Sequence, residues 1–470
     1  MNKFKLFIEN FVIYGLGGII SKAIPLIMVP VITKIMPSSD YYGVSDLANT
    51  IVQFGSALAV MGMYDAMYRL FFEKDDIDYK KTVCSTALLV TISTSVIVFI
   101  AMIVFKDNIS KLFFNDRKYA NLVYLSAMAT LLGATNSIVS APIRMQNKRK
   151  IYIIANTIGP LISYSIAVPL LLAGHYLIAL PLAAVISAFS MECTFIFINR
   201  EWFSYKKINV ELIKPLLKIA IPLLPNFLIY WIFNSCDKVM IANFIGTNAS
   251  GVYSVSSKLG QCSQLVYTAF AGGWQYFAFS TMKEKNQVES NSKIFEYLGV
   301  VSFAVSAIVF TCSFSIFKIL FSEEYLEGYV AAPYLFLAPL LQMLFQVSAN
   351  QFLIIKKTWP SMFILLSGAA INIILNIILI PVLGIEGASI ATVLGYVVAN
   401  LVCVLVLLRM KLMTISLKFI FVVVFFIVYI MMWRFLFKTN LICALVASFL
   451  FITFLVILYY RDIRLIFDSK

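Results

Sequence analysis

Long apolar runs separated by short polar breaks occupy almost the whole chain. A helix needs about 20 apolar residues to cross the hydrocarbon core of a bilayer, and most runs reach that length. The pattern predicts an all-α polytopic membrane protein with about 14 transmembrane helices and no loop long enough to form a domain. The predicted helices are Leu6–Ile35, Gly43–Tyr68, Thr82–Phe105, Tyr119–Ile143, Ile151–Ala173, Tyr176–Asn199, Leu212–Phe244, Ser250–Ser280, Ile294–Phe321, Tyr329–Ile355, Ser361–Val382, Gly387–Leu408, Ile415–Phe437 and Leu441–Tyr460.

The basic residues predict how these helices cross the membrane. Lys and Arg are enriched in short cytoplasmic loops. With both termini in the cytoplasm, 26 of the 37 Lys and Arg residues lie on the cytoplasmic side, 8 lie outside and 3 lie within spans. One polar break assigned to the outer side, residues 106–118, carries four Lys and Arg residues and is an exception to this distribution. We therefore expect a multi-pass protein of the cell (inner) membrane with both termini cytoplasmic.

The chain also contains an internal repeat. The segment PSSDYYGVSDLA, which follows the first predicted helix, matches GTNASGVYSVSS after the seventh, and Gly43 corresponds to Gly251 at a separation of 208 residues. The basic break around Arg149 matches the break at Lys357 with the same separation. A six-helix unit enters the membrane in the same direction in both copies, which predicts two lobes around a central cleft. The predicted domains are 1–210, 211–410 and two additional C-terminal helices in 411–470.

Composition narrows the functional classes. At 61% hydrophobic and 13% charged residues, the chain has too few polar side chains to cover a soluble globule of 470 residues. The seven cysteines show no paired spacing, so we expect small buried hydrophobes rather than disulfides or metal ligands. No phosphate-binding loop, H-E-x-x-H motif or Cys/His cluster occurs in the sequence. We expect neither an enzyme nor a bound cofactor, and no nucleic-acid partner.

The first predicted helix carries a cation near its middle. Lys22 lies in the apolar segment Tyr14–Ile35, and Pro25 and Pro30 follow within two turns. A lysine at that depth costs about 3 kcal/mol by insertion scales, so such residues normally face a bundle interior or water. Each proline removes a backbone hydrogen bond and kinks the helix. We expect a bent wall of a wet cavity; the alternative is a lysine that pairs with a carboxylate between helices.

Polar side chains recur at helical spacing along the eighth predicted helix. Steps of three, four and seven residues would place them on one face of a continuous helix. This face is predicted to meet water or a polar ligand, and the alternative is hydrogen bonding between helices. The stripe consists of Ser254, Ser257, Lys258, Gln261, Gln264 and Thr268.

Further ionisable residues lie in or at the ends of predicted spans. Asp65 and Arg69 are four residues apart near the cytoplasmic end of the second helix, where they also fit a local ion pair. Glu192 lies in the sixth helix. Asp237 and Lys238 are adjacent in the seventh, so their side chains must point to different sides of it.

Three segments resemble a known family. The helix 7 to helix 8 signature of polysaccharide flippases is similar to the segment from Ile221, IPLLPNFLIYWIFNSCDKVMIANFIGTNASGVYSVSSKLG. The end of their helix 2 is similar to GMYDAMYRLFFE from Gly62. Their G-x-x-G-A-x-x-A-T element is similar to GIEGASIATVLGY from Gly384. Together they make the chain resemble the Wzx-type O-antigen and capsule-unit flippases of the multidrug/oligosaccharidyl-lipid/polysaccharide exporter superfamily. The resemblance implies transfer of an undecaprenyl-diphosphate-linked oligosaccharide from the cytoplasmic to the outer leaflet.

This resemblance and the physical arguments above define a candidate site. Asp65, Arg69, Asp237 and Lys238 match motif positions of the family. Cations suit the substrate phosphates and amides suit the sugar hydroxyls. The expected substrate-binding residues are Lys22, Arg69, Lys238, Lys258, Gln261 and Gln264, and the candidates for coupling to H+ or Na+ are Asp65, Glu192 and Asp237. Expected partners are the polyprenyl-diphosphate-linked oligosaccharide, membrane lipids, and the polysaccharide polymerase and chain-length machinery.

Three other functions compete with this interpretation. A multidrug or cation antiporter of the same superfamily would favour an acidic, apolar cleft, whereas the candidate cleft here is basic. A lipid II flippase of a related branch would share the fold and a lipid diphosphate substrate. A membrane scaffold or a glycan polymerase belongs to another class, and a polymerase should carry a large outer loop, which this sequence lacks.

Overall fold

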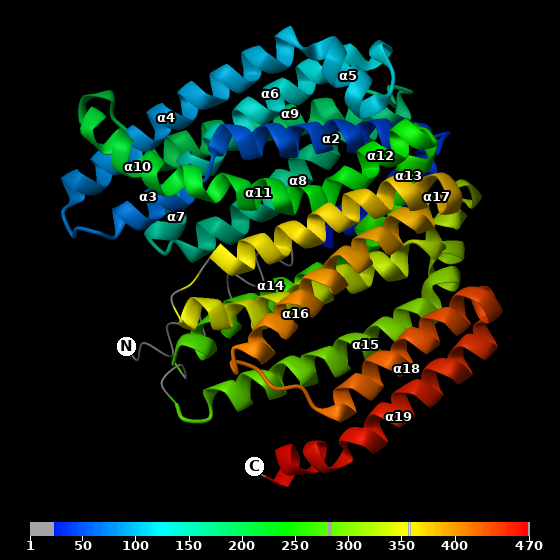
Figure 1. Cartoon of the computed structure of the whole chain (residues 1–470). Helices are drawn as coiled ribbons and strands as arrows, with labels where there is room; N and C mark the ends of the chain where they lie inside the picture. Colours follow the sequence, from blue (N-terminus) through cyan, green and yellow to red (C-terminus); the bar gives the residue numbers. More distant parts are fainter. Residues whose placement is uncertain (1–22, 281–283, 356, 358, 469–470) are drawn as a thin grey trace. The chain divides into compact units, whose positions relative to one another are not determined.

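The computed structural model describes residues 23–280, 284–355, 357 and 359–468, and helices with short connections make up this part of the chain (Figure 1). No strand occurs among the described residues. The contacts between Cα atoms divide the chain into two compact units, Met1–Ser254 and Val255–Lys470, called here the N-terminal and C-terminal units. The predicted lobe boundaries, which follow the sequence repeat, stay a prediction.

The N-terminal unit holds a series of helices of very different lengths. After a helix at Ala23–Ile35 come α2 (Ser39–Val60), α3 (Met63–Phe71), α4 (Ile77–Val104), α5 (Lys106–Phe114), α6 (Ala120–Val139), α7 (Ala141–Met145), α8 (Arg149–Leu172), α9 (Ala179–Asn199), α10 (Ile213–Ala220), α11 (Leu224–Trp231), the π-helix η6 (Ile232–Cys236), α12 (Asp237–Phe244) and the start of α13 (Thr247–Gly260).

The C-terminal unit begins within α13 and has fewer, longer helices. They are α14 (Cys262–Ser280), α15 (Gln287–Leu320), the 3-10 helix η7 (Glu323–Val330), α16 (Ala332–Ile354), α17 (Trp359–Arg409), α18 (Leu417–Met432), the π-helix η8 (Trp433–Phe437) and α19 (Leu441–Asp468).

Among the described residues, ten helices are long and apolar enough to cross a membrane, or eleven if α2 and α3, which are bent by 43°, form one span. The predicted count of fourteen is therefore not confirmed. Part of the first predicted helix lies outside the described residues, and the eighth is interrupted at Gln261 between α13 and α14. The protein is a multi-pass, all-helical membrane protein.

Two of the predicted helices form the single element α17. Its 51 residues would extend to more than twice the ~30 Å of the hydrocarbon core if the helix were straight. The backbone instead breaks at Gly384, with φ 61° and ψ −138°. Beyond the break, Gly387 lies so close to the carbonyl of Leu379 that no side chain fits, and the Asn372 amide donates a hydrogen bond to the Thr392 hydroxyl over 3.3 Å. The two halves therefore form an antiparallel hairpin.

Glycines from the two copies of the repeated motif contact each other within the N-terminal unit. A Cβ atom on Gly43 would collide with the carbonyl of Thr247, and one on Gly251 would collide with the carbonyl of Ser39. Small residues of this kind allow helix backbones to approach closely. The helices α2 and α13 thus cross where the repeat places its paired glycines.

The polar contacts at this crossing are reciprocal. The Ser39 hydroxyl donates to the side-chain oxygen Oδ1 of Asn248 over 2.7 Å, and the Thr247 hydroxyl donates to the carboxylate of Asp40. With the repeat offset of 208 residues, Ser39 corresponds to Thr247 and Asp40 to Asn248. Each residue therefore contacts the counterpart of its neighbour, which is the pattern of a local two-fold contact.

Apolar packing attaches the α10–α12 segment to the rest of the N-terminal unit. The α3 side chains Met63 and Met67 form a fully buried cluster with Val83 of α4 and Leu216 of α10. Burial of apolar surface contributes about 25 cal/mol per Å2, so a cluster of this kind holds α10 firmly against α3. The helices that follow α10, namely α11 and α12, are thereby positioned beside α2.

Candidate functional site

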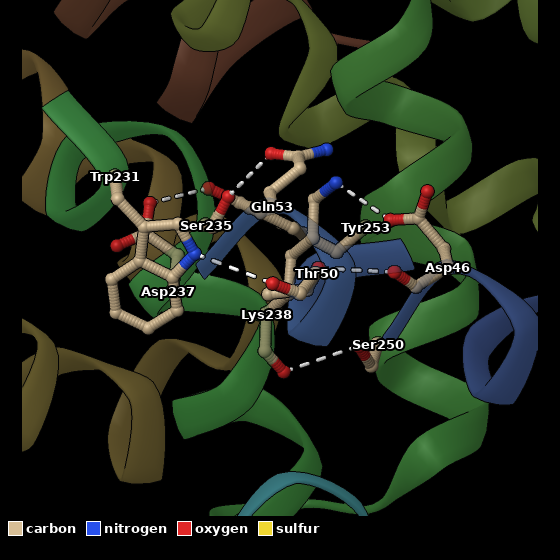
Figure 2. Close-up of polar contacts among 9 residues, drawn as sticks. All are labelled: Asp46, Thr50, Gln53, Trp231, Ser235, Asp237, Lys238, Ser250 and Tyr253. Atoms are coloured by element: carbon tan, nitrogen blue, oxygen red, sulfur yellow. Dashed lines mark hydrogen bonds and ion pairs between the residues drawn. The ribbon is translucent and has the colours of Figure 1, made fainter. Parts of the chain in front are cut away.

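Polar side chains from α2, η6, α12 and α13 meet inside the N-terminal unit (Figure 2). At its centre the Lys238 ammonium forms an ion pair with the Asp46 carboxylate, with 2.6 Å between Nζ and Oδ2. Only 3% and 6% of the two side chains are exposed. Burying two charges is expensive, and each is tolerated because the other compensates it. The pair therefore joins α2 to α12 at a point from which water is largely excluded.

The neighbouring carboxylate is directed to a different helix. Asp237, which is 2% exposed, accepts a hydrogen bond from the Tyr253 hydroxyl of α13 over 2.7 Å. The Ser250 hydroxyl, also on α13, donates to the backbone carbonyl of Lys238 over 3.1 Å. Two consecutive residues thus connect α12 to α2 on one side and to α13 on the other.

A π-helix precedes these two residues. In η6 the backbone makes wider turns than an α-helix, and such insertions are frequent at functional sites because they rotate the residues that follow. Within η6 the Ser235 hydroxyl donates to Oε1 of Gln53 over 3.2 Å, and just before it the Trp231 indole donates to the carbonyl of Thr50 over 3.4 Å. The contacts to α2 therefore extend from Asp46 to Gln53, about two helical turns.

These polar contacts between helices are called here the Lys238 cluster, which consists of Asp46, Thr50, Gln53, Trp231, Ser235, Asp237, Lys238, Ser250 and Tyr253. No group of three or more His, Cys, Asp and Glu residues in the described part of the chain is placed to hold a metal ion. The charges of Lys238 and Asp46 compensate each other, so the pair presents little net charge to a phosphate. The cluster holds α2, α12 and α13 together through a buried ion pair and buried hydrogen bonds.

The other predicted residues of the N-terminal unit lie in different places. Lys22 is outside the described residues. Asp65 and Arg69 are exposed on α3, and no ion pair joins them in the described chain. Instead, Asp65 is close enough to Arg144 of α7 for an electrostatic interaction. Asp65 thus lies near Arg144, a cation that the sequence did not predict as its partner.

Glu192 is a buried carboxylate without a cationic partner. It lies on α9 with 9% of its surface exposed, beside Thr135 of α6. Its Oε2 atom has no hydrogen-bond partner among the described residues, and no ion pair to it is found there. An unpaired charge in such a position is costly. Its proposed part in coupling stays a prediction.

The predicted polar stripe does not run along one helix. Lys258 is half-buried near the end of α13, Gln261 is exposed at the turn, and Gln264 is half-buried in the first turn of α14. The helix is interrupted at Gln261, so these three residues belong to two helices and the turn between them. Their assignment as substrate-binding residues stays a prediction.

Among the members of the Lys238 cluster that sequence reasoning missed are the partners of its two charged residues on α12. Asp46 lies in the repeated motif PSSDYYGVSDLA and Tyr253 in its second copy, GTNASGVYSVSS. A carboxylate within a predicted span is itself a signal, since an intramembrane acid needs a partner. The motif indicates the internal repeat, but nothing in it indicates that Asp46 pairs with Lys238.

A model of a polysaccharide biosynthesis protein family matches residues 31–327. The chain belongs to this family. An uncharacterized membrane protein of Methanocaldococcus jannaschii is 30% identical to this family member over 165 residues, which cover 34% of this chain. The chain thus matches about a third, 32%, of the length of that relative.

Solved structures show that this polysaccharide biosynthesis family protein has a known transporter fold. The lipid II flippase MurJ, in an inward closed conformation, aligns with a TM-score of 0.72 at 14% identity and covers 96% of this chain and 99% of its own. An inward-facing multidrug resistance MATE family transporter of the MOP superfamily aligns with a TM-score of 0.60 at 14% identity, covering 84% of this chain and 98% of its own. The predicted all-helical fold is confirmed, and these two structures with the same fold are those of a flippase and a transporter.

Proposed function

We propose that this protein is a flippase of the Wzx type, which moves undecaprenyl-diphosphate-linked oligosaccharide repeat units from the cytoplasmic to the outer leaflet by alternating access. The observation that carries the proposal is the match to a polysaccharide biosynthesis family over residues 31–327, on a chain with the fold of a lipid flippase. The protein would act in the cell (inner) membrane with both termini cytoplasmic, and would pass its substrate to the polymerase and chain-length machinery.

The charge of the chain supports an anionic substrate. The formal net charge is +14, and cations recur at Lys22, Arg69, Lys238 and Lys258. A lipid-linked sugar diphosphate brings charged phosphates, a polar glycan and a polyprenyl tail, so its path must offer cations and hydrogen-bond donors. An inside-negative potential favours outward movement of a negative group by about 2.3 kcal/mol per net charge per 100 mV. H+ or Na+ coupling through Asp65, Glu192 or Asp237 would add to this driving force.

The Lys238 cluster supports a mechanism in which helices move as groups. Alternating access in many transporters is a rocking of one packed bundle against another. The Lys238–Asp46 pair fixes α2 to α12 inside the N-terminal unit. In our proposal, substrate phosphate competes with Asp46 for Lys238, and the exchange of partners loosens α12 from α2 during transport.

Deletion of the encoding gene in the native host tests this function. Cells without the protein should accumulate undecaprenyl-linked repeat units on the inner leaflet and lose the corresponding surface polysaccharide, and a restored copy of the gene should reverse both effects. Unchanged surface glycan together with raised sensitivity to cationic dyes would contradict the proposal and favour the antiporter.

A lipid II flippase is the second candidate, because the MurJ structure aligns over 96% of this chain. Depletion of a host's own lipid II flippase separates the two. Rescue of growth by this protein would establish lipid II transport, whereas lysis despite normal abundance of the protein would leave the repeat-unit flippase as the better proposal.

A further inference from the structure

The N-terminal unit contains a cavity that the Lys238 cluster does not use. Its volume is about 360 Å3, and its walls come from α6, α7, α8 and α9. Small-molecule sites typically measure about 300–1,000 Å3, so this space fits one small polar group rather than an entire oligosaccharide. The polar side chains lining it are Asn136, Ser137, Ser140, Arg144, Tyr152 and Asn156.

Arg144 supplies the charge of this cavity. It is the one charged side chain among the lining residues, and none of them carries a carboxylate. Its guanidinium carbon lies 5.6 Å from the ring centroid of Tyr152 and 5.9 Å from that of Tyr64. In the described chain Arg144 forms no ion pair, although Asp65 lies within range of an electrostatic interaction. The guanidinium therefore retains donors that an anion can accept from.

Polar atoms beside Arg144 are also unsatisfied. In the described structure, Oδ1 of Asn136 and the hydroxyl of Tyr64 are buried without a hydrogen-bond partner. Buried polar atoms normally have partners, so these two atoms retain hydrogen-bonding capacity beside the guanidinium. An aromatic face, an amide and a hydroxyl next to an arginine suit a sugar phosphate, because the guanidinium matches phosphate oxygens in a bidentate geometry.

The repeat shows that the fold does not require these polar residues. With the offset of 208 residues, two polar positions of the cavity have counterparts in the second copy of the repeat. The offset is established from Gly43 to Arg149, and within that range the counterparts of Asn136 and Arg144 are Leu344 and Phe352, which are 2% and 0% exposed. These two positions are thus filled by buried apolar side chains in one copy and are polar beside a cavity in the other. This difference favours a function particular to the N-terminal unit.

We infer that this cavity binds the sugar phosphate end of the lipid-linked substrate, with Arg144 as the phosphate ligand. The inference rests on the proposed function and adds a site to it. Arg144 begins the basic break that the charge bias assigns to the cytoplasmic side, where the substrate is made available. The tyrosine rings would flank the guanidinium, and Asn136 and Asn156 would bind sugar hydroxyls.

Binding to the purified full chain in phosphatidylcholine nanodiscs tests the site. The probe is N-acetylglucosamine joined through a diphosphate to farnesol, compared with the same sugar joined to farnesol without phosphate. Arg144→Gln should weaken binding of the diphosphate probe at least tenfold, Arg144→Lys should weaken it less, and the phosphate-free probe should not respond. The matched control is Lys148→Gln, an exposed cation that does not line the cavity. Equal losses in the Lys148 and Arg144 variants would overturn the inference, because they would indicate diffuse surface charge.

A second variant fills the cavity and leaves every charge in place. A Cβ atom on Gly159 would meet only the flexible Met191 side chain, at 3.7 Å, so a larger residue can enter the space. Gly159→Leu should also lower affinity for the diphosphate probe at least tenfold. Unchanged affinity in this variant would place the anion outside the cavity and refute the assignment.

Surface glycan in cells separates failure of the site from failure of the proposed function. If deletion of the gene leaves the glycan unchanged, the flippase function is wrong. If deletion removes the glycan and Arg144→Gln at normal membrane abundance restores it fully, the function stands and the Arg144 site is wrong. We expect deletion to remove the glycan, Lys148→Gln to restore it and Arg144→Gln to fail.

Discussion

Lys238 of α12 and Asp46 of α2 form a buried ion pair in which each charge compensates the other. The family motif and the cost of a buried cation both marked Lys238 as important. Its partner lies 192 residues away along the chain, and no local pattern predicts a contact over that separation. The pairing depends on the packing of α12 against α2, which only the three-dimensional structure supplies.

Breaking this pair should destabilise the protein. Asp46→Asn leaves the Lys238 ammonium buried without its counter-charge, and loss of one partner of a buried pair costs about 3–5 kcal/mol. We expect a clear fall in membrane abundance and in the midpoint of thermal unfolding in detergent. The double variant Asp46→Asn with Lys238→Met should recover stability, because no uncompensated charge remains. A single variant as stable as the wild type would show that the pair is not a structural link.

Glu192 should behave in the opposite way. Its carboxyl group has no ion pair in the described chain, so Glu192→Gln keeps the shape of the side chain and replaces the carboxyl by a group that cannot carry a charge. We expect unchanged or slightly higher thermal stability. If Glu192 couples transport to protons, the variant should also lose the dependence of transport on external pH. Glu201→Gln, an exposed acid after the same helix, serves as the control. A pH dependence that persists in Glu192→Gln would exclude Glu192 as the coupling residue.

At the scale of elements, the spacing of apolar residues located most helices but not their interruptions. The break in α17 was predictable, because the apolar pattern pauses at Gly384-Ile-Glu-Gly387 and glycine adopts the positive φ found there. The π-helix η6 and the interruption at Gln261 were not. Each of these two interruptions changes the carbonyl to which a backbone amide donates its hydrogen bond. The side chains at both places are compatible with a regular helix, so the sequence does not mark the change.

The crossing of α2 and α13 should depend on its two glycines. In Gly251→Ala the new methyl group would collide with the carbonyl of Ser39, and in Gly43→Ala it would collide with the carbonyl of Thr247. Forcing extra atoms into a packed contact typically costs about 1–3 kcal/mol. We expect each variant to lower the unfolding midpoint measured in detergent.

Gly133→Ala is the matched control for this crossing. Its new Cβ would lie 3.8 Å from the Ser56 hydroxyl, an ordinary contact, and alanine favours a helix more than glycine does. The control should therefore be neutral or stabilising. Equal effects at all three glycines would mean that the close approach of α2 and α13 is not required.

For the whole molecule, composition and periodicity were sufficient to predict a multi-pass helical protein, and short motifs were sufficient to relate it to polysaccharide biosynthesis. The number of spans was harder to predict. The 51-residue element α17 can be counted as one span or as two, and so can the bent pair of α2 and α3. The arrangement of cations was beyond the sequence for a different reason. In the sequence, Lys238 and Arg144 are both single positive charges next to apolar residues. In the structure, Lys238 is buried in an ion pair and Arg144 lines a cavity.

The orientation of the chain in the membrane gives the last prediction. Because 26 of the 37 Lys and Arg residues fall on one side of the predicted topology, the breaks that carry them should be cytoplasmic. Reporter fusions after Lys150, Lys207 and Lys357 should therefore report cytoplasm, and fusions near His175 and Glu324 should report the outer side. The Glu324 fusion is the most informative, because it lies in η7 between the long helices α15 and α16. A cytoplasmic signal there would require that α15 and the elements before it cross the membrane a different number of times, and it would reverse every assignment that follows.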